Sequence, residues 1–309
     1  MMIDRPLSRL LVLGTLALTA HLCDAADGTW TSDSNGLWSD ADKWQGGIVA
    51  DGVGASATFD RSHYSLSRTI KLDQNRTLGQ ILAIKTGADD GPRHVIITGD
   101  ANCVLTLDNG SSTATLTNSG SGAVRIDPAV ALRSDLTLTN STTTFLALNS
   151  AVSAASTGLK TLTISPSDGR INLAGIISDG AGQLALTVNA GSANVNVIAA
   201  NTYSGGTSVH SGSLVTNTQS TLGTGDVTVT DGRLVLGNDK AIGSAASLSF
   251  GLRSAIVLNY AGSMNIVNAA IGATFIGKGT YSAKQLNEFF GGSFFSGSGR
   301  LTITTGSGG

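Results

Sequence analysis

The sequence is poor in the residues that build helices. Of its 21 acidic residues only Glu288 is a glutamate, and the others are aspartates. Glutamate favours helix interiors, whereas aspartate favours turns and helix caps. We therefore expect a chain with almost no helix.

Charge and cysteine are also scarce. Charged residues make up 13% of the chain, and the formal net charge is −2. A nucleic-acid-binding protein needs a basic face that releases counterions from phosphates, so we expect no nucleic-acid partner. Of the two cysteines, Cys23 lies in a segment that we expect to be removed, which leaves Cys103 alone and predicts no internal disulfide.

The chain is rich in glycine and aliphatic residues. It holds 40 glycines but only 4 prolines, and hydrophobic residues reach 41% although aromatic residues account for 5%. Many glycines without proline predict tight turns between short strands rather than a disordered linker. The core must then be built mainly from leucine, isoleucine, valine and alanine.

The first 25 residues have the pattern of a secretory signal peptide. Arg5 and Arg9 precede an apolar run from Leu10 to Leu18, and small residues up to Ala25 fit a cleavage site. A membrane span needs roughly 20 apolar residues, which is longer than this run. We expect residues 1–25 to be a signal peptide and the mature chain to have no transmembrane segment. The expected location is secreted or at the cell surface, with the periplasm as the alternative.

Short alternating segments recur at regular spacing from about residue 80. Alternation with period two places one face of each segment inward, and spacings of 8–12 residues are typical of a sandwich, a barrel or a solenoid. The expected strands are Ile81 to Ile84, Val95 to Thr98, Val104 to Leu107, Ala114 to Thr117, Val124 to Ile126, Leu136 to Thr139, Phe145 to Leu148, Leu162 to Ile164, Ile171 to Leu173, Leu184 to Val188 and Val195 to Ile198.

Two features favour a parallel β-solenoid over a β-sandwich or another antiparallel all-β fold. The repetition continues for some 200 residues without a break in composition, which is longer than a typical sandwich. The strands are also very short, as in a coil that turns a corner every few residues and stacks on its neighbours. The prediction is an all-β chain wound as a β-helix.

The two ends differ from the middle. Residues 26–60 contain all three tryptophans and predict an N-terminal cap, residues 61–275 form the strand repeats, and residues 276–309 form a C-terminal cap with a tail. Ser282 and Gln285 have the spacing of a capping box and predict a short helix over 282–290. Its apolar face is expected to be Leu286, Phe289 and Phe290, which would cover the last coil.

One segment resembles a known family. It consists of Asn201, Thr202, Tyr203, Ser204, Gly205, Gly206 and Thr207, continuing to Val215. This order resembles the autotransporter-associated β-strand repeat found in passenger-type exported bacterial proteins, and the likeness is best over residues 195–237. The resemblance implies a right-handed parallel β-helix in a secreted or surface protein, with no family-wide catalytic residues.

The expected function is that of a non-catalytic structural or adhesive surface protein. No catalytic residue, metal ligand or cofactor is expected, since the histidines lack the spacing of a metal pair. The expected partners are extracellular polysaccharides or cell-surface proteins. The alternatives are a carbohydrate-active β-helix enzyme, either a polysaccharide lyase or a hydrolase, and a carbohydrate-binding module.

The three tryptophans fit two roles. Trp30, Trp38 and Trp44 could stack on sugars if their rings were exposed. They could instead plug the open N-terminal end of the solenoid, and their place at the beginning of the chain favours the plug.

Overall fold

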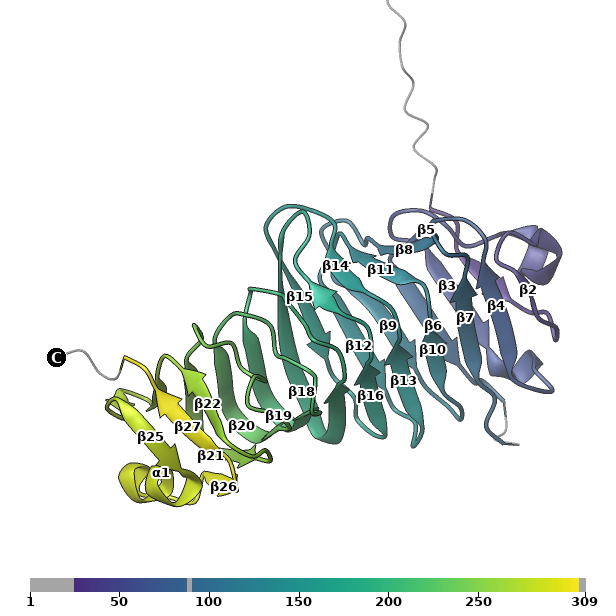
Figure 1. Cartoon of the computed structure of the whole chain (residues 1–309). Coiled ribbons are helices and arrows are strands. Elements are labelled where there is room, and N and C mark those ends of the chain that lie inside the picture. Colours follow the sequence, from purple (N-terminus) through teal and green to yellow (C-terminus); the bar gives the residue numbers. More distant parts are fainter. Residues whose placement is uncertain (1–24, 88–90, 306–309) are drawn as a thin grey trace, which may run out of the picture.

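The chain forms a parallel β-solenoid of about nine turns, seen along its length in Figure 1. In this computed structural model, residues 25–87 and 91–305 are described. About 6% of the chain is helical. Pairing between the strands of the described residues is parallel, except between β23 and β24 and between β25 and β27, where it is antiparallel. Two isolated bridges near the N-terminal end, Ala26 with Asp51 and Trp30 with Trp44, are also antiparallel. The predicted β-helix is therefore confirmed, and the antiparallel alternative is wrong.

The turns before β18 place short strands on three ladders, the third of which begins in the second turn. The first ladder contains β1 (Gly28–Trp30), β3 (Ser56–Asp60), β6 (Gln80–Ile84), β9 (Ala114–Asn118), β12 (Leu136–Asn140) and β15 (Leu159–Ile164). The second contains β2 (Gly36–Leu37), β4 (Arg68–Leu72), β7 (Val95–Gly99), β10 (Val124–Ile126), β13 (Phe145–Leu148) and β16 (Arg170–Leu173). The third contains β5 (Arg76–Leu78), β8 (Val104–Leu107), β11 (Ala129–Leu132), β14 (Val152–Ala154) and β17 (Ile177–Ser178).

From β18 onward the first two ladders merge into long strands. These are β18 (Gln183–Val197), β19 (Thr207–Thr216), β20 (Val227–Leu236) and β21 (Leu248–Leu258). The first half of β18 pairs with β15 and its second half with β16. The expected strands Leu184 to Val188 and Val195 to Ile198 are thus two parts of one strand that bends between them.

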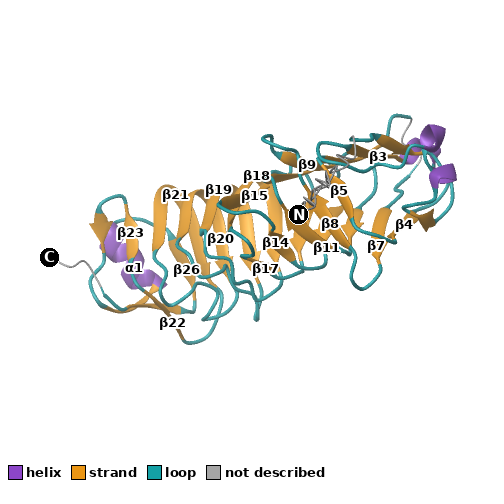
Figure 2. Ribbon diagram, turned by 90° about the horizontal axis from the view of Figure 1, so that it is seen from above, coloured by secondary structure: helices purple, strands orange, loops and turns teal. Residues whose placement is uncertain are grey.

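The C-terminal end closes with shorter elements. They are β22 (Ser263–Ile266), β23 (Ala269–Ile271), β24 (Thr274–Phe275), β25 (Gly279–Ser282), α1 (Ala283–Phe290), β26 (Phe295–Gly297) and β27 (Arg300–Ile303). Three short 3-10 helices, η1 (Ala41–Lys43), η2 (Gln45–Gly47) and η3 (Arg61–His63), lie toward the other end. Figure 2 shows that helices occupy the two ends and strands the middle.

One column of aliphatic side chains shows how the core is built. Ile81, Leu116, Leu138, Ile164, Val188, Val209 and Val229 are register partners on successive turns, and each of them is fully buried. Burying such a side chain is worth roughly 1.5–3 kcal/mol. Because a single turn cannot cover its own inward face, this stabilisation depends on the turns above and below it.

Strand pairing already begins within the tryptophan-rich segment. Strand β1 pairs with β3, which pairs in turn with β6. The segment over 26–60 therefore forms the first coil of the solenoid as well as the cap on its N-terminal end. The expected signal peptide at 1–25 lies outside the described residues except for Ala25.

Candidate functional site

The three tryptophans are packed together inside the N-terminal end. Trp30 and Trp38 are fully buried, and Trp44 is 3% exposed. The ring centroids of Trp30 and Trp44 lie 5.4 Å apart, and those of Trp38 and Trp44 lie 5.2 Å apart. Their indole N–H groups donate to backbone carbonyls, for example Trp38 Nε1 to Ala50 O at 3.0 Å. Stacking on a sugar needs an open ring face, and this burial favours the plug over the sugar site.

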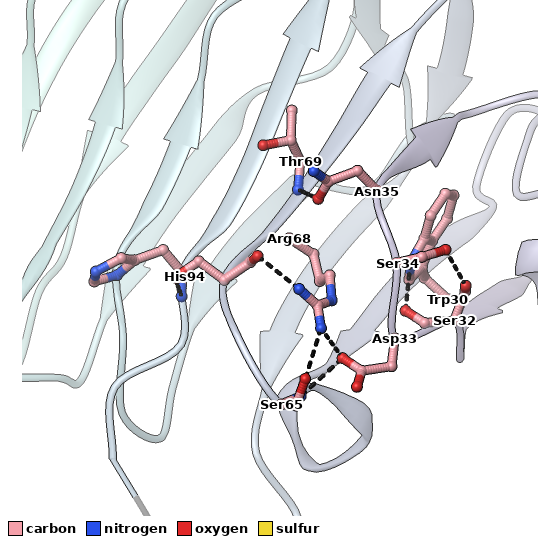
Figure 3. Close-up of polar contacts among 10 residues, drawn as sticks. Trp30, Ser32, Asp33, Ser34, Asn35, Ser65, Arg68, Thr69 and His94 are labelled. Carbon is pink, nitrogen blue, oxygen red and sulfur yellow. Dashed lines mark hydrogen bonds and ion pairs between the residues drawn. The ribbon is translucent and has the colours of Figure 1, made fainter.

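Polar side chains around this end connect one coil to the next (Figure 3). The Asp33 carboxylate accepts a hydrogen bond from Ser65 N at 2.7 Å and pairs with the Arg68 guanidinium. The Asn35 side chain accepts from Thr69 N at 2.8 Å. The backbone and side-chain hydrogen bonds from Ser65, together with Arg68, lower the pKa of Asp33 to about 2.

The same arrangement recurs along the solenoid. Aspartate carboxylates accept hydrogen bonds from backbone N–H groups of the following coil, at distances of 2.8–3.1 Å. These pairs are Asp27 with Ser56, Asp51 with Thr77, Asp135 with Thr161, Asp179 with Ser204 and Asp226 with Ser247. Because each carboxylate accepts from a backbone N–H group of the next coil, these aspartates connect coils.

Each buried residue of the repeat motif at 201–207 has a structural role. Asn201 Oδ1 accepts from Ile177 N in the coil before it at 2.7 Å, and Asn201 Nδ2 donates to Thr221 O in the coil after it at 2.7 Å. Tyr203 is fully buried, and its hydroxyl lies 2.6 Å from Thr207 Oγ1. Burial raises the pKa of the Tyr203 hydroxyl, which keeps it neutral.

The glycine pair of the motif allows neighbouring coils to approach closely. A Cβ atom added at Gly205 would lie 2.6 Å from Leu184 O, and Gly206 has a φ of +86°. Thr202 and Ser204 lie toward the surface. The motif is therefore explained by packing between coils.

A buried polar cluster inside the N-terminal half was not among the predicted site residues. Arg61 is fully buried and donates from Nη1 to Ser119 O at 2.8 Å and from Nη2 to Asn118 Oδ1 at 2.5 Å. Asn118 Nδ2 donates in turn to Asn140 Oδ1 at 2.8 Å. Burial lowers the pKa of Arg61 to about 10. The recurrence of Leu-Thr-Asn at 116–118 and 138–140 is the sequence signal that could have found this stack.

The C-terminal cap differs from its prediction at one residue. Helix α1 begins after Ser282, whose side chain and Gln285 form the capping box, and ends at Gly291 with a φ of 71°. Leu286 is fully buried, and the Phe290 ring centroid lies 4.9 Å from that of Phe250. Phe289, however, is 48% exposed, so its assignment to the covered face of the helix was wrong. In an eight-residue helix the packed stripe is narrow, and Phe290 fills the space beside Phe250.

A groove follows the bend of the long strands. We call it the corner groove; its volume is about 490 Å³, and it is lined by Gly191, Ser192, Ser211, Gly212, Ser213, Asp231, Gly232, Arg233, Arg253 and Ala255. Asp231 and Arg253 are register partners on β20 and β21, and Ser213 and Arg233 are register partners on β19 and β20. Strands are spaced about 4.8 Å apart, so these side chains form rows along the solenoid.

Glycine keeps the floor of the corner groove open. Gly212 and Gly232 both have positive φ, 77° and 108°, at the point where the strand turns. A Cβ atom at Gly232 would lie 2.8 Å from Gly212 O. The bend therefore needs glycine on successive coils, and the bare backbone that results forms the base of the groove.

In the part of the chain that the structure describes, no group of three or more histidine, cysteine, aspartate or glutamate residues could hold a metal ion. No helix within it has the length and apolarity needed to cross a bilayer. Comparisons of the chain with protein-family models, curated proteins and solved structures found no match.

Proposed function

We propose that this chain is an exported, non-catalytic surface protein with a structural or adhesive role, of the kind that the autotransporter-associated repeat resemblance implies. The hydrogen bonding of the aspartates is the observation that supports this proposal most. A glycoside-hydrolysing site needs two carboxylates that flank one glycosidic bond. Here Asp27, Asp51, Asp135, Asp179 and Asp226 lie on separate coils, and each accepts hydrogen bonds from backbone N–H groups.

The outward rows of the solenoid also support a contact role. Along β12 the residues alternate between buried leucine and half-buried threonine, and β9 has the same arrangement. Register pairing places Thr115 beside Thr137 and Thr117 beside Thr139. Rows of hydroxyl groups repeated along a rigid scaffold suit a surface that touches extracellular polysaccharides or cell-surface proteins through many weak contacts.

A polysaccharide panel tests the non-catalytic part of the proposal. The purified full chain is incubated with neutral and acidic polysaccharides, and new reducing ends and unsaturated products are measured. We expect neither product above the level of a heat-unfolded sample. Product release that depends on folded protein would overturn the non-catalytic proposal and favour the lyase or hydrolase alternative.

Export is tested by the mass of the secreted chain. We expect protein recovered outside the cytoplasm to begin near Ala25 or Ala26, because the signal peptide is predicted to end there. Intact-mass measurement checks this. A chain that retains Met1 after secretion would contradict the proposed route.

A further inference from the structure

The corner groove holds polar groups that the rest of the protein does not use. Arg233 is exposed, and no hydrogen bond or ion pair of its side chain occurs among the described residues. Arg253 lies 3.7 Å from Asp231, and its side chain is 82% exposed. The groove thus has two arginines against one aspartate, so it carries a net positive charge.

Ser213 adds an independent observation. This residue lines the groove and is 9% exposed, yet its hydroxyl has no hydrogen-bond partner within the described part of the chain. Buried hydroxyl groups are normally paired. Ser213 and Arg233 are register partners on neighbouring strands, so the unpaired guanidinium lies at the same register position as this hydroxyl. Since the Ser213 oxygen is itself inaccessible, the guanidinium is the group that is open to a ligand.

We propose that the corner groove binds an acidic polysaccharide, with Arg233 and Arg253 pairing with uronate carboxylates. A planar guanidinium matches a carboxylate with two parallel hydrogen bonds, which makes arginine the side chain suited to this group. The two arginines lie on adjacent strands, β20 and β21, but two register positions apart, because Arg253 pairs with Asp231 and Arg233 with Ala255. A linear ligand that crosses the strands obliquely therefore meets both.

The remaining lining favours a sugar chain over a peptide. Ser192 and Ser211 supply hydroxyl groups, of which the Ser211 oxygen also accepts from Gly191 N at 3.1 Å. The remaining side chains without charge are those of the buried Ser213 and of Ala255. A bound peptide needs apolar pockets for its side chains or an open sheet edge for its backbone. The groove has neither, since it lies on a sheet face whose strands are paired on both sides.

This inference rests on the proposed function, because it names the ligand of a protein already proposed to make surface contacts. The test uses the full chain and oligogalacturonate as the probe, with binding measured by calorimetry. We expect Arg233→Gln and Arg253→Gln each to weaken binding about tenfold, the usual size of a lost hydrogen bond to a charged group. Binding should also weaken as the salt concentration rises.

A matched double variant controls for lost charge. Arg133 and Arg170 are exposed and lie outside the corner groove. We expect Arg133→Gln with Arg170→Gln to bind oligogalacturonate as the wild type does, while Arg233→Gln with Arg253→Gln loses binding and retains the same thermal unfolding temperature. Equal affinities of the two double variants would overturn the proposal.

Two comparison ligands separate the sources of negative charge. Methyl-esterified oligogalacturonate has the same backbone without free carboxylates, and dextran sulfate carries sulfates. We expect both to bind more weakly than oligogalacturonate. Stronger binding of either would overturn the assignment to carboxylates. Cleavage of a bound oligomer would overturn the non-catalytic proposal alone, whereas absence of both binding and cleavage would overturn the groove alone.

Discussion

The N-terminal and C-terminal halves of the solenoid form the same core with different coils. Before β18 a turn uses three short strands, and the register partners Leu116 and Leu138 are separated by 22 residues (138 − 116) and Leu138 and Ile164 by 26 (164 − 138). After β18 one bent strand serves two ladders, and Val209 and Val229 are separated by 20 residues (229 − 209). Figure 1 shows the change from the teal to the green part of the chain.

The shorter coils replace the third ladder with side-chain hydrogen bonds. Residues 198–206, 217–226 and 237–247 connect the long strands where β5, β8, β11, β14 and β17 lie in the other half. Asn238 Nδ2 donates to Asn217 O and to Ser220 O, both at 2.8 Å, and Asn217 Nδ2 donates to Ile198 O at 3.2 Å. Backbone groups need partners, and asparagine supplies them without a strand.

Replacing Tyr203 should have the largest effect on stability. Its ring fills the third side of the coil in the half of the solenoid that lacks a third ladder. We expect Tyr203→Ala to lower the free energy of unfolding by about 4 kcal/mol, as for other buried aromatic truncations. Tyr203→Phe keeps the ring but loses the contact with Thr207 Oγ1, and should cost about 1 kcal/mol. Urea unfolding followed by circular dichroism measures both.

The comparison predicts where Tyr203→Ala acts. Coils contact only their neighbours, so the loss should appear as early opening of residues 183–258 while the third ladder before β18 stays folded. Limited proteolysis with mass spectrometry locates the first cuts. First cuts within residues 95–154 would contradict the local role of Tyr203.

Substitutions in the C-terminal cap should change the stability less, and two neighbouring phenylalanines of helix α1 provide the test and its control. Phe290 packs edge-to-face on Phe250, whereas Phe289 is 48% exposed. We expect Phe290→Ala to lower the free energy of unfolding by about 2 kcal/mol, which is less than for a fully buried phenylalanine, and Phe289→Ala to lower it by less than about 1 kcal/mol. Thermal unfolding compares the two variants.

The cap account also predicts a change in association. An uncovered last coil presents N–H and C=O groups that can pair with another chain. Phe290→Ala should therefore form larger species in size-exclusion chromatography before the solenoid unfolds. If Phe289→Ala associates as strongly as Phe290→Ala, the covering role of Phe290 is wrong.

Acid should affect the N-terminal half more than the C-terminal half. Hydrogen bonds from Ser65 with the Arg68 pair lower the pKa of Asp33 to about 2. Burial works in the opposite direction at Asp60 and Asp73, but hydrogen bonds from Ser62, Thr86 and Ser39 hold both pKa values below their ordinary range. Asp179, near the start of the long strands, is lowered in the same way.

The direction of the pH dependence of stability follows from these lowered pKa values. A carboxyl with a lower pKa in the folded state stabilises the fold above its ordinary pKa, and this stabilisation is lost as the pH falls toward the folded value. We expect the protection of the amides in residues 56–72, measured relative to the intrinsic exchange rate at each pH, to fall between about pH 4 and pH 2 before that of residues 207–236 does. Asp33→Asn should weaken this pH dependence, and an unchanged profile would contradict it.

The sequence predicted strand bounds correctly where turn residues flank a short segment of alternating apolar residues. Val104–Leu107, Val124–Ile126 and Phe145–Leu148 were predicted with the bounds that the structure has. Alternating apolar residues between turn residues are enough to define such strands.

The third ladder was largely missed, since only β8 among its members was expected. Strands β11, β14 and β17 follow another strand after two or three residues, and β17 has only two residues. Their partners lie one turn away in the sequence, so no local pattern reveals the pairing. The corner groove was missed for the same reason, because Ser213, Arg233 and Arg253 meet only when coils stack.

Hydrogen exchange at single amides tests the central claim that polar side chains connect the coils. The decisive groups are the N–H groups of Ile177, Ser204 and Ser247, which donate to Asn201, Asp179 and Asp226 respectively at 2.7, 3.1 and 2.8 Å. The account predicts that these amides exchange as slowly as ladder amides such as that of Val209. Exchange at the rate of open turn residues would contradict it.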